Sequence, residues 1–186
     1  MAMRTITHLY DTYADATEVV ADLEAAGIPR DDISLVGRHD ETESRAGTGT
    51  GIGAVLGGGV GLLAGIGSLA IPGVGPVVAA GWLVATLAGA VVGGGAGGIV
   101  GSLVHTGVSD EEAQVYAEGV RRGGSLVTVR TDEIRAVEAE RIMNGRTYVD
   151  WRVRNQEYRD NGWVGFDEAA PPYIPPTVPD ERVRGL

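Results

Sequence analysis

The chain has 186 residues, with 15 basic and 25 acidic side chains and a formal net charge of -10. This length suits one ordinary domain with an accessory segment, and the acidic balance excludes nucleic acid as an expected partner, because phosphates are bound by clustered lysine and arginine. The sequence contains no cysteine, which excludes disulfides, thiolate metal sites and thiol nucleophiles.

The first forty residues predict a strand, a helix and a second strand. No long apolar run precedes Asp11, so we expect no secretory signal and a location on the cytoplasmic side. Residues 5–10 are typical of a short strand, and residues 15–26 carry apolar side chains at helical spacing before Gly27. Residues 33–36 predict the second strand. The apolar positions of this helix are Val19, Val20 and Leu23.

The middle of the chain is uncharged between Arg45 and Asp110 and holds most of the glycines. Two apolar stretches, 49–71 and 77–104, flank a Pro-Gly-Val-Gly-Pro turn at 72–76, which predicts a helical hairpin. As a helix the first stretch would be about 34 Å long, enough for the roughly 30 Å hydrocarbon core of a bilayer. The hairpin is therefore a candidate pair of transmembrane helices.

Small residues recur at every fourth position in both stretches, a spacing that lets helix backbones approach closely. Each interior glycine costs a helix about 1 kcal/mol relative to alanine, so we expect such helices to require neighbours. The environment is either a membrane or the centre of a soluble assembly, and a flexible linker is the third alternative. The helix-packing residues are Gly49, Gly53, Gly57, Gly61 and Gly65 in the first row and Gly81, Ala85, Gly89, Gly93, Gly97 and Gly101 in the second.

After this window the alternation of helices and strands resumes. Ser109 and Glu112 form a capping box for a helix that ends at Gly123. Residues 125–130 alternate like a half-buried strand, and residues 147–153 predict another strand. Between these strands, Asp132 is placed to cap a helix whose apolar positions are Ile134, Val137 and Ile142.

This order favours an α+β domain, with a ferredoxin-like sheet as the simplest closed arrangement. The expected organisation is residues 1–46 as its first part, 47–107 as the glycine-zipper hairpin, 108–153 as its second part and 154–186 as a flexible proline-rich tail. In the tail, residues 172–175 and 176–179 have the Pro-x-x-Pro spacing that polyproline-binding partners use. We expect disorder there rather than a partner.

No motif points to catalysis, a cofactor or a metal. Residues 93–98 match G-x-G-x-x-G, but they lie within the glycine row rather than between a strand and an amphipathic helix. The three histidines lack ligand spacing, although His105 could titrate near neutral pH. The acidic pair at 31–32 and the acidic run at 110–112 are expected to serve helix ends rather than acid-base chemistry.

Four stretches resemble the bacterial general stress protein 17M-like (heat-induced stress protein) family. They are T-H-L-Y-D-T at residues 7–12, D-L-E-A-A-G-I-P-R-D-D-I-S-L-V at 22–36, I-P-G-V-G-P at 71–76, and the run at 111–129. The resemblance covers about residues 4–150 and implies a role in stress responses, often at a membrane, without catalytic residues. The proline-rich tail lies outside it.

Together these features predict a non-enzymatic, stress-associated protein that self-associates through the hairpin at the cytoplasmic membrane. Its expected partners are further copies of itself and membrane lipid, with no nucleic acid and no small-molecule substrate. Arginines flank the hairpin on both sides, so both of its ends should face the cytoplasm. The alternative is a soluble homo-oligomeric particle with the hairpins buried at its centre.

Overall fold

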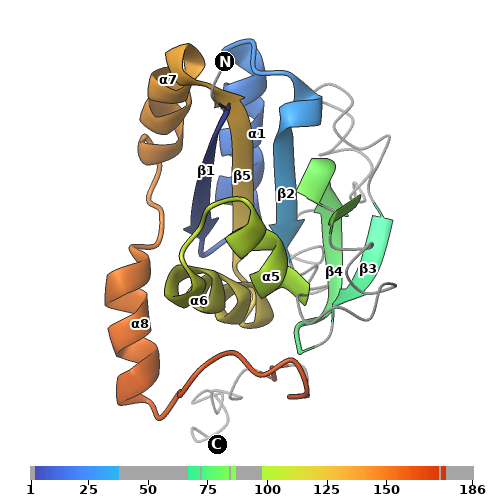
Figure 1. Cartoon of the computed structure of the whole chain (residues 1–186), viewed down its shortest axis with the longest axis vertical. Coiled ribbons are helices and arrows are strands. Elements are labelled where there is room, and N and C mark those ends of the chain that lie inside the picture. The colour runs from blue at the N-terminus through green and yellow to red at the C-terminus, as the bar shows by residue number, and fades with distance from the viewer. Residues whose placement is uncertain are drawn as a thin grey trace, which may run out of the picture.

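The computed structural model describes residues 3–37, 67–71, 73–83, 85–86, 98–171 and 173–174. These residues form a mixed helix and strand fold around a five-stranded antiparallel sheet of order β1-β5-β2-β4-β3 (Figure 1). The described strands are β1 (Met3–Tyr10), β2 (Ile33–Gly37), β3 (Gly67–Ile71), β4 (Gly75–Ala80) and β5 (Ser125–Asp132). The described helices are α1 (Tyr13–Ala25), the 3-10 turn η1 (Arg30–Asp32), α5 (Gly98–His105), α6 (Asp110–Arg121), α7 (Glu133–Asn144) and α8 (Trp151–Asp160).

Helices pack on both faces of the sheet. Figure 1 shows α5 and α6 on the near side and α1 on the far side. On β5, Leu126 belongs to the hydrophobic cluster beneath α5 and α6, whereas Val127 and Val129 belong to the cluster beneath α1 and α7. Successive side chains of a strand point to opposite faces, so the two clusters form two cores. We call these faces the α5/α6 face and the α1/α7 face.

The first strand-helix-strand unit is confirmed. The Thr12 side chain accepts a hydrogen bond from the Asp15 backbone and so caps α1. The three apolar positions predicted for this helix are fully buried on the α1/α7 face, where each contributes roughly 1.5 to 3 kcal/mol. Helix α6 and strand β5 are also confirmed, and the Ser109 hydroxyl accepts from the Glu112 backbone as the capping box requires.

The predicted helical hairpin is wrong within the described residues. Residues 67–71 and 75–80 form the antiparallel strands β3 and β4, with Ile71 paired to Gly75 across the tight turn between them. Only α5, at the end of the second apolar stretch, is helical over more than a short turn. No helix in the described ranges has the length and apolar character needed to cross a membrane, which corrects the predicted transmembrane helices. Residues 38–66 and 87–97 lie outside the described part.

The predicted last strand and flexible tail are also wrong in part. Residues 147–150 are not a strand, and α8 follows, capped by the Asp150 carboxylate. Asn155 and Tyr158 of α8 are buried, so ordered structure continues well past residue 154. Residues 175–186 lie outside the described part, so disorder there stays a prediction.

Helix α7 begins at the predicted Asp132 cap but turns a different face to the sheet. Ile134 and Val137 are 83% and 69% exposed. The buried positions are Ala136, Ala139 and Met143 instead. The two alanines allow the helix to approach the sheet and α1 closely. Ile142, the third predicted apolar position, is partly buried against the same cluster.

The ferredoxin-like arrangement is not confirmed. Strand β5 does lie between β1 and β2, which are joined by α1. The sheet is extended, however, by the β3-β4 hairpin, and helices cover both of its faces. The described residues therefore form a mixed helix and strand fold with a five-stranded antiparallel sheet.

Candidate functional site

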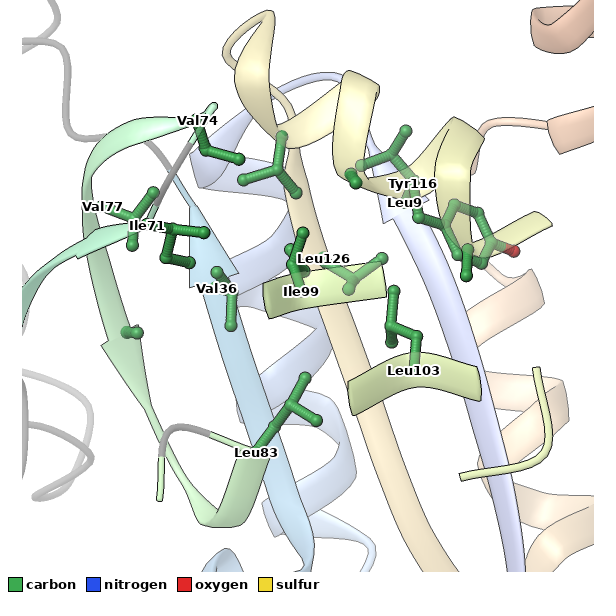
Figure 2. Close-up of a cluster of buried hydrophobic side chains, with 14 of the residues drawn as sticks. Leu9, Val36, Ile71, Val74, Val77, Leu83, Ile99, Leu103, Tyr116 and Leu126 are labelled. Carbon is green, nitrogen blue, oxygen red and sulfur yellow. The ribbon is translucent and has the colours of Figure 1, made fainter. Parts of the chain in front are cut away.

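The α5/α6 face gathers the apolar side chains that border the glycine-rich stretches. In Figure 2, Ile99 and Leu103 of α5 lie over Val36 and Leu126 of the sheet. The middle of the uncharged window and the helix near its end are thus part of the domain core. The cluster residues contributed by the window are Ile71, Val74, Val77, Ala79, Leu83, Ile99 and Leu103.

The residues that flank the undescribed stretch 38–66 lie on the half of the sheet formed by β2, β4 and β3. Gly37, the last residue before 38–66, pairs with Val78, and Gly67, the first residue after it, pairs with Ala79. The second stretch, 87–97, is bordered by residues of the α5/α6 cluster on either side.

The segment after α8 packs against the same face. It continues from the C-terminal end of α8 and passes below α6 in the view of Figure 1. Phe166 packs against the cluster, and its backbone N–H donates to Gln114 Oε1 at 3.4 Å. A Cβ on Gly73 would lie 2.6 Å from the Asp167 carbonyl oxygen, and one on Gly98 would lie 2.8 Å from Glu168 Oε1. The segment thus touches the β3-β4 turn and the start of α5.

A buried carboxylate organises the end of α6. Glu118 is 0% exposed, and it accepts from Arg122 Nε at 2.7 Å and from an Arg121 guanidinium nitrogen at 3.1 Å. A buried charge is tolerated when it is paired in this way. The Arg122 guanidinium also lies 4.2 Å from the ring centroid of Tyr158 and 5.1 Å from that of Tyr173.

Sequence reasoning missed this cluster. Neither the motifs nor the apolar pattern of the sequence points to Glu118. Its position three and four residues before Arg121 and Arg122 signals ion pairs on one helix face. Burial of the carboxylate follows from α8 and the tail covering that face, and this packing is not visible in the sequence.

A groove of about 320 Å³ opens between α1 and α7. Its charged groups pair with one another: Arg146 contacts Asp22 at 3.4 Å, and Arg141 contacts Glu138 at 2.5 Å. A charged ligand would have to displace these partners. The groove is lined by Asp22, Ala25, Ala26, Glu138, Arg141, Ile142, Gly145 and Arg146.

His8 is the histidine with the most distinctive surroundings in the described chain. Its ring is stacked on Tyr148, with 4.3 Å between centroids and 9° between planes. Burial lowers the pKa of His8, and the nearby Glu140 charge only partly opposes this. Its Nδ1 is buried and has no hydrogen-bond partner in the described ranges. The neutral form is therefore favoured at neutral pH.

The other predicted polar positions serve structure. Asp32 contacts Arg130 at 3.3 Å, and Asp110 accepts from Gln114 at 2.6 Å. His105 is exposed at the end of α5, and His39 lies outside the described residues. The described part of the chain brings no three histidine or carboxylate side chains together as a metal site.

The glycine rows are only partly described. The first row and residues Gly89, Gly93 and Gly97 lie outside the described ranges, as does most of the 93–98 motif. Gly81 is not on a helix: it follows β4 with a φ of 93°, and a Cβ there would lie 2.1 Å from the Ile33 carbonyl oxygen. The predicted row from 81 to 101 is therefore not one continuous helix, although Gly101 lies within α5.

No protein-family model, curated protein or solved structure matches this chain. The resemblance to the general stress protein 17M-like family stays a prediction.

Proposed function

We propose that this protein acts without catalysis, as a stress-associated protein whose glycine-rich stretches make contacts between copies. The placement of the ends of those stretches carries the proposal. Gly37 and Gly67 lie on either side of β4 at nearly the same level. The α5/α6 cluster borders the second stretch. One half of each copy would therefore present both stretches to a neighbour.

The composition of the stretches supports self-contact. No charged residue occurs between Arg45 and Asp110, so apolar and backbone contacts would dominate any interface formed there. Rows of small residues remove side chains along one ridge and so permit close approach between backbones. The stress association rests on the family resemblance alone.

Sedimentation velocity of the full chain tests the proposal with matched substitutions. Gly57→Leu places a large side chain in the first row, whereas Gly59→Leu makes the same change in the same stretch outside the row. We expect Gly57→Leu to weaken association by about tenfold or more and Gly59→Leu to change it little. Gly93→Leu and Gly95→Leu form the second matched pair. Circular dichroism should show the same folded domain in all four variants.

Two results would overturn the proposal in different ways. A parent chain that stays monomeric at all concentrations would remove self-association altogether. Equal weakening by row and off-row substitutions would keep self-association but remove the glycine rows as its basis.

Contact with the cytoplasmic membrane is a second part of the proposal, supported by the same uncharged composition. Flotation of the full chain with lipid vesicles tests it, since a lipid-bound protein rises with the vesicles. A protein that stays at the bottom as a large particle without detergent would favour the assembly without lipid.

We also propose that the unit formed by β1, α1, β2 and β5 is related to the ferredoxin-like arrangement. Its support is the position of β5 between β1 and β2, the pattern of a split β-α-β unit. An experimental structure with β1 directly paired to β2 would contradict this relation.

A further inference from the structure

The end of α6 and one side of α8 form a rigid aromatic and cationic surface. Glu118 holds Arg122 through its Nε at 2.7 Å, which fixes the plane of the guanidinium. The Arg122 guanidinium carbon then lies 4.2 Å from the Tyr158 ring centroid. Tyr158 in turn meets Trp163 edge to face, with 5.6 Å between ring centroids. We call Arg121, Arg122, Tyr158 and Trp163 the arginine-aromatic surface.

A tyrosine from the proline-rich tail occupies this surface. The Tyr173 ring centroid lies 5.1 Å from the guanidinium carbon of Arg122 and 5.8 Å from that of Arg121. Arg122 is therefore close to two aromatic rings, whose negative faces attract its positive charge. The neighbouring Ile174 is 83% exposed, so of these two described residues it is the tyrosine that faces the arginines.

The sequence around Tyr173 is Pro-Pro-Tyr-Ile-Pro-Pro at residues 171–176. Such segments favour the extended polyproline conformation, whose backbone carbonyls have no internal hydrogen-bond donors. Trp163 Nε1 is buried and donates to no acceptor within the described residues. An indole N–H is a donor only. The described residues of the chain's own tail supply no acceptor to it.

We propose that the arginine-aromatic surface is a recognition site for a tyrosine in a proline-rich segment, and that it binds this segment from a second copy of the chain. The contacts available to a neighbour's Tyr173 are identical to those made by the chain's own, so exchange requires no new surface. This inference goes beyond the proposed function, which concerns the glycine-rich stretches.

The chain's own tail and the tail of a second copy compete for the arginine-aromatic surface, and their local concentrations decide which of them binds. The chain's own tail is present at an effective concentration in the millimolar range, as for short flexible linkers. A free second copy competes poorly at lower concentration. Within an assembly, a neighbour's tail reaches a comparable local concentration and can replace it.

A synthetic peptide of residues 169–178 tests recognition, with the full chain carrying Tyr173→Ala as receptor. Fluorescence polarisation of the labelled peptide should show binding to this variant and at least about tenfold weaker binding to the parent, whose own tail occupies the site. The matched control peptide carries alanine in place of the tyrosine and should not bind. This control leaves the protein unchanged, so it does not depend on the folding of a further variant.

A second receptor, carrying both Tyr173→Ala and Arg122→Gln, should lose the binding because the guanidinium is absent. Circular dichroism checks that it remains folded. Recognition is wrong if the tyrosine peptide fails to bind the Tyr173→Ala chain or if both peptides bind it equally.

Mixing two variants tests exchange between copies. The Tyr173→Ala chain offers an empty site without a tyrosine, and an Arg122→Gln chain offers an intact tail without a complete site. Native mass spectrometry of an equimolar mixture should show dimers that contain one copy of each variant. The fraction of these mixed pairs should exceed the fraction that random pairing of the two variants would give. Mixed pairs at only the statistical fraction would overturn exchange, whatever the glycine-row variants show.

Discussion

The two faces of the sheet are closed by different kinds of sequence. On the α1/α7 face the covering helices carry apolar residues inward and ion pairs outward, such as Arg146 with Asp22 and Arg141 with Glu138. On the α5/α6 face the core is completed largely by the uncharged window, through the β3-β4 hairpin and α5. An uncharged, glycine-rich window can thus supply part of a domain core from its middle, through the β3-β4 hairpin, and from α5 near its end.

The largest loss of stability is expected when one leucine is removed from either face of the sheet. Leu103 on the α5/α6 face and Leu23 on the α1/α7 face are both fully buried. We expect Leu103→Ala and Leu23→Ala each to lower the free energy of unfolding by about 3 to 4 kcal/mol, through lost burial and the cavity left behind. Urea unfolding should show one cooperative transition for both variants. A separate early transition that only Leu103→Ala shifts would mean that the window folds as an independent unit.

A second test concerns the close approach after β4. Gly81→Ala places a Cβ against the Ile33 carbonyl oxygen in a left-handed backbone conformation, and it should cost about 2 to 3 kcal/mol. Gly27→Ala is the matched control, because Gly27 has a similar φ of 83° with nothing within 4 Å of the added Cβ. It should cost about 1 kcal/mol from the backbone alone. Equal midpoints in thermal unfolding would show that Gly81 does not pack against β2 as described.

The caps of the helices on the two faces contribute less to stability and differ in their hydrogen bonds. Asp132 caps α7 with two hydrogen bonds, at 3.1 and 3.0 Å, whereas Ser109 caps α6 with one at 3.4 Å. We expect Asp132→Ala to cost about 1.5 kcal/mol and Ser109→Ala about 0.5 kcal/mol in chemical denaturation. The reverse order would contradict the cap geometry of the two helices.

The smallest expected effect is a pH dependence carried by His8 on the α1/α7 face. Because burial lowers its pKa below 6.5, the unfolded chain binds the proton at a higher pH than the folded chain. The free energy of unfolding should therefore fall as the pH drops below about 6.5 and should not change through this group above that value. His8→Phe keeps a ring against Tyr148 and should remove this part of the acid sensitivity. Urea unfolding midpoints of the parent and the variant, measured above and below this pH, test this effect. An equal fall in the midpoint of both proteins at low pH would exclude His8 as the cause.

The elements that sequence alone predicts are those with local signals at both ends. Helix α6 has the Ser109 cap and a glycine stop, and α1 has a clear apolar spacing. The 67–80 region has neither: it is a short uncharged run, and apolar runs of that length do not distinguish a buried strand from a buried helix. Its proline and glycine turn predicts a hairpin correctly but does not specify strands.

At helix α8 the sequence predicts a strand where the structure has a helix. Val149, Trp151 and Val153 alternate as a strand would, yet Asp150 caps a helix at that point. Its buried residues, Asn155 and Tyr158, are polar or amphipathic, so the apolar pattern gives no signal for its packing. The arginine-aromatic surface depends on that packing, which is why the sequence pattern did not reveal it.

The pairing of β4 with β2 on one side and β3 on the other has a consequence for the length of the connection between β2 and β3. Gly37 and Gly67 are fixed two strand spacings apart, roughly 10 Å, and a connection of about a dozen residues would be ample to join them. Residues 38–66 exceed that length considerably. The connection between β2 and β3 therefore sets no upper limit on the length of this stretch, and changes of its length need not alter the pairing of β4 with either strand.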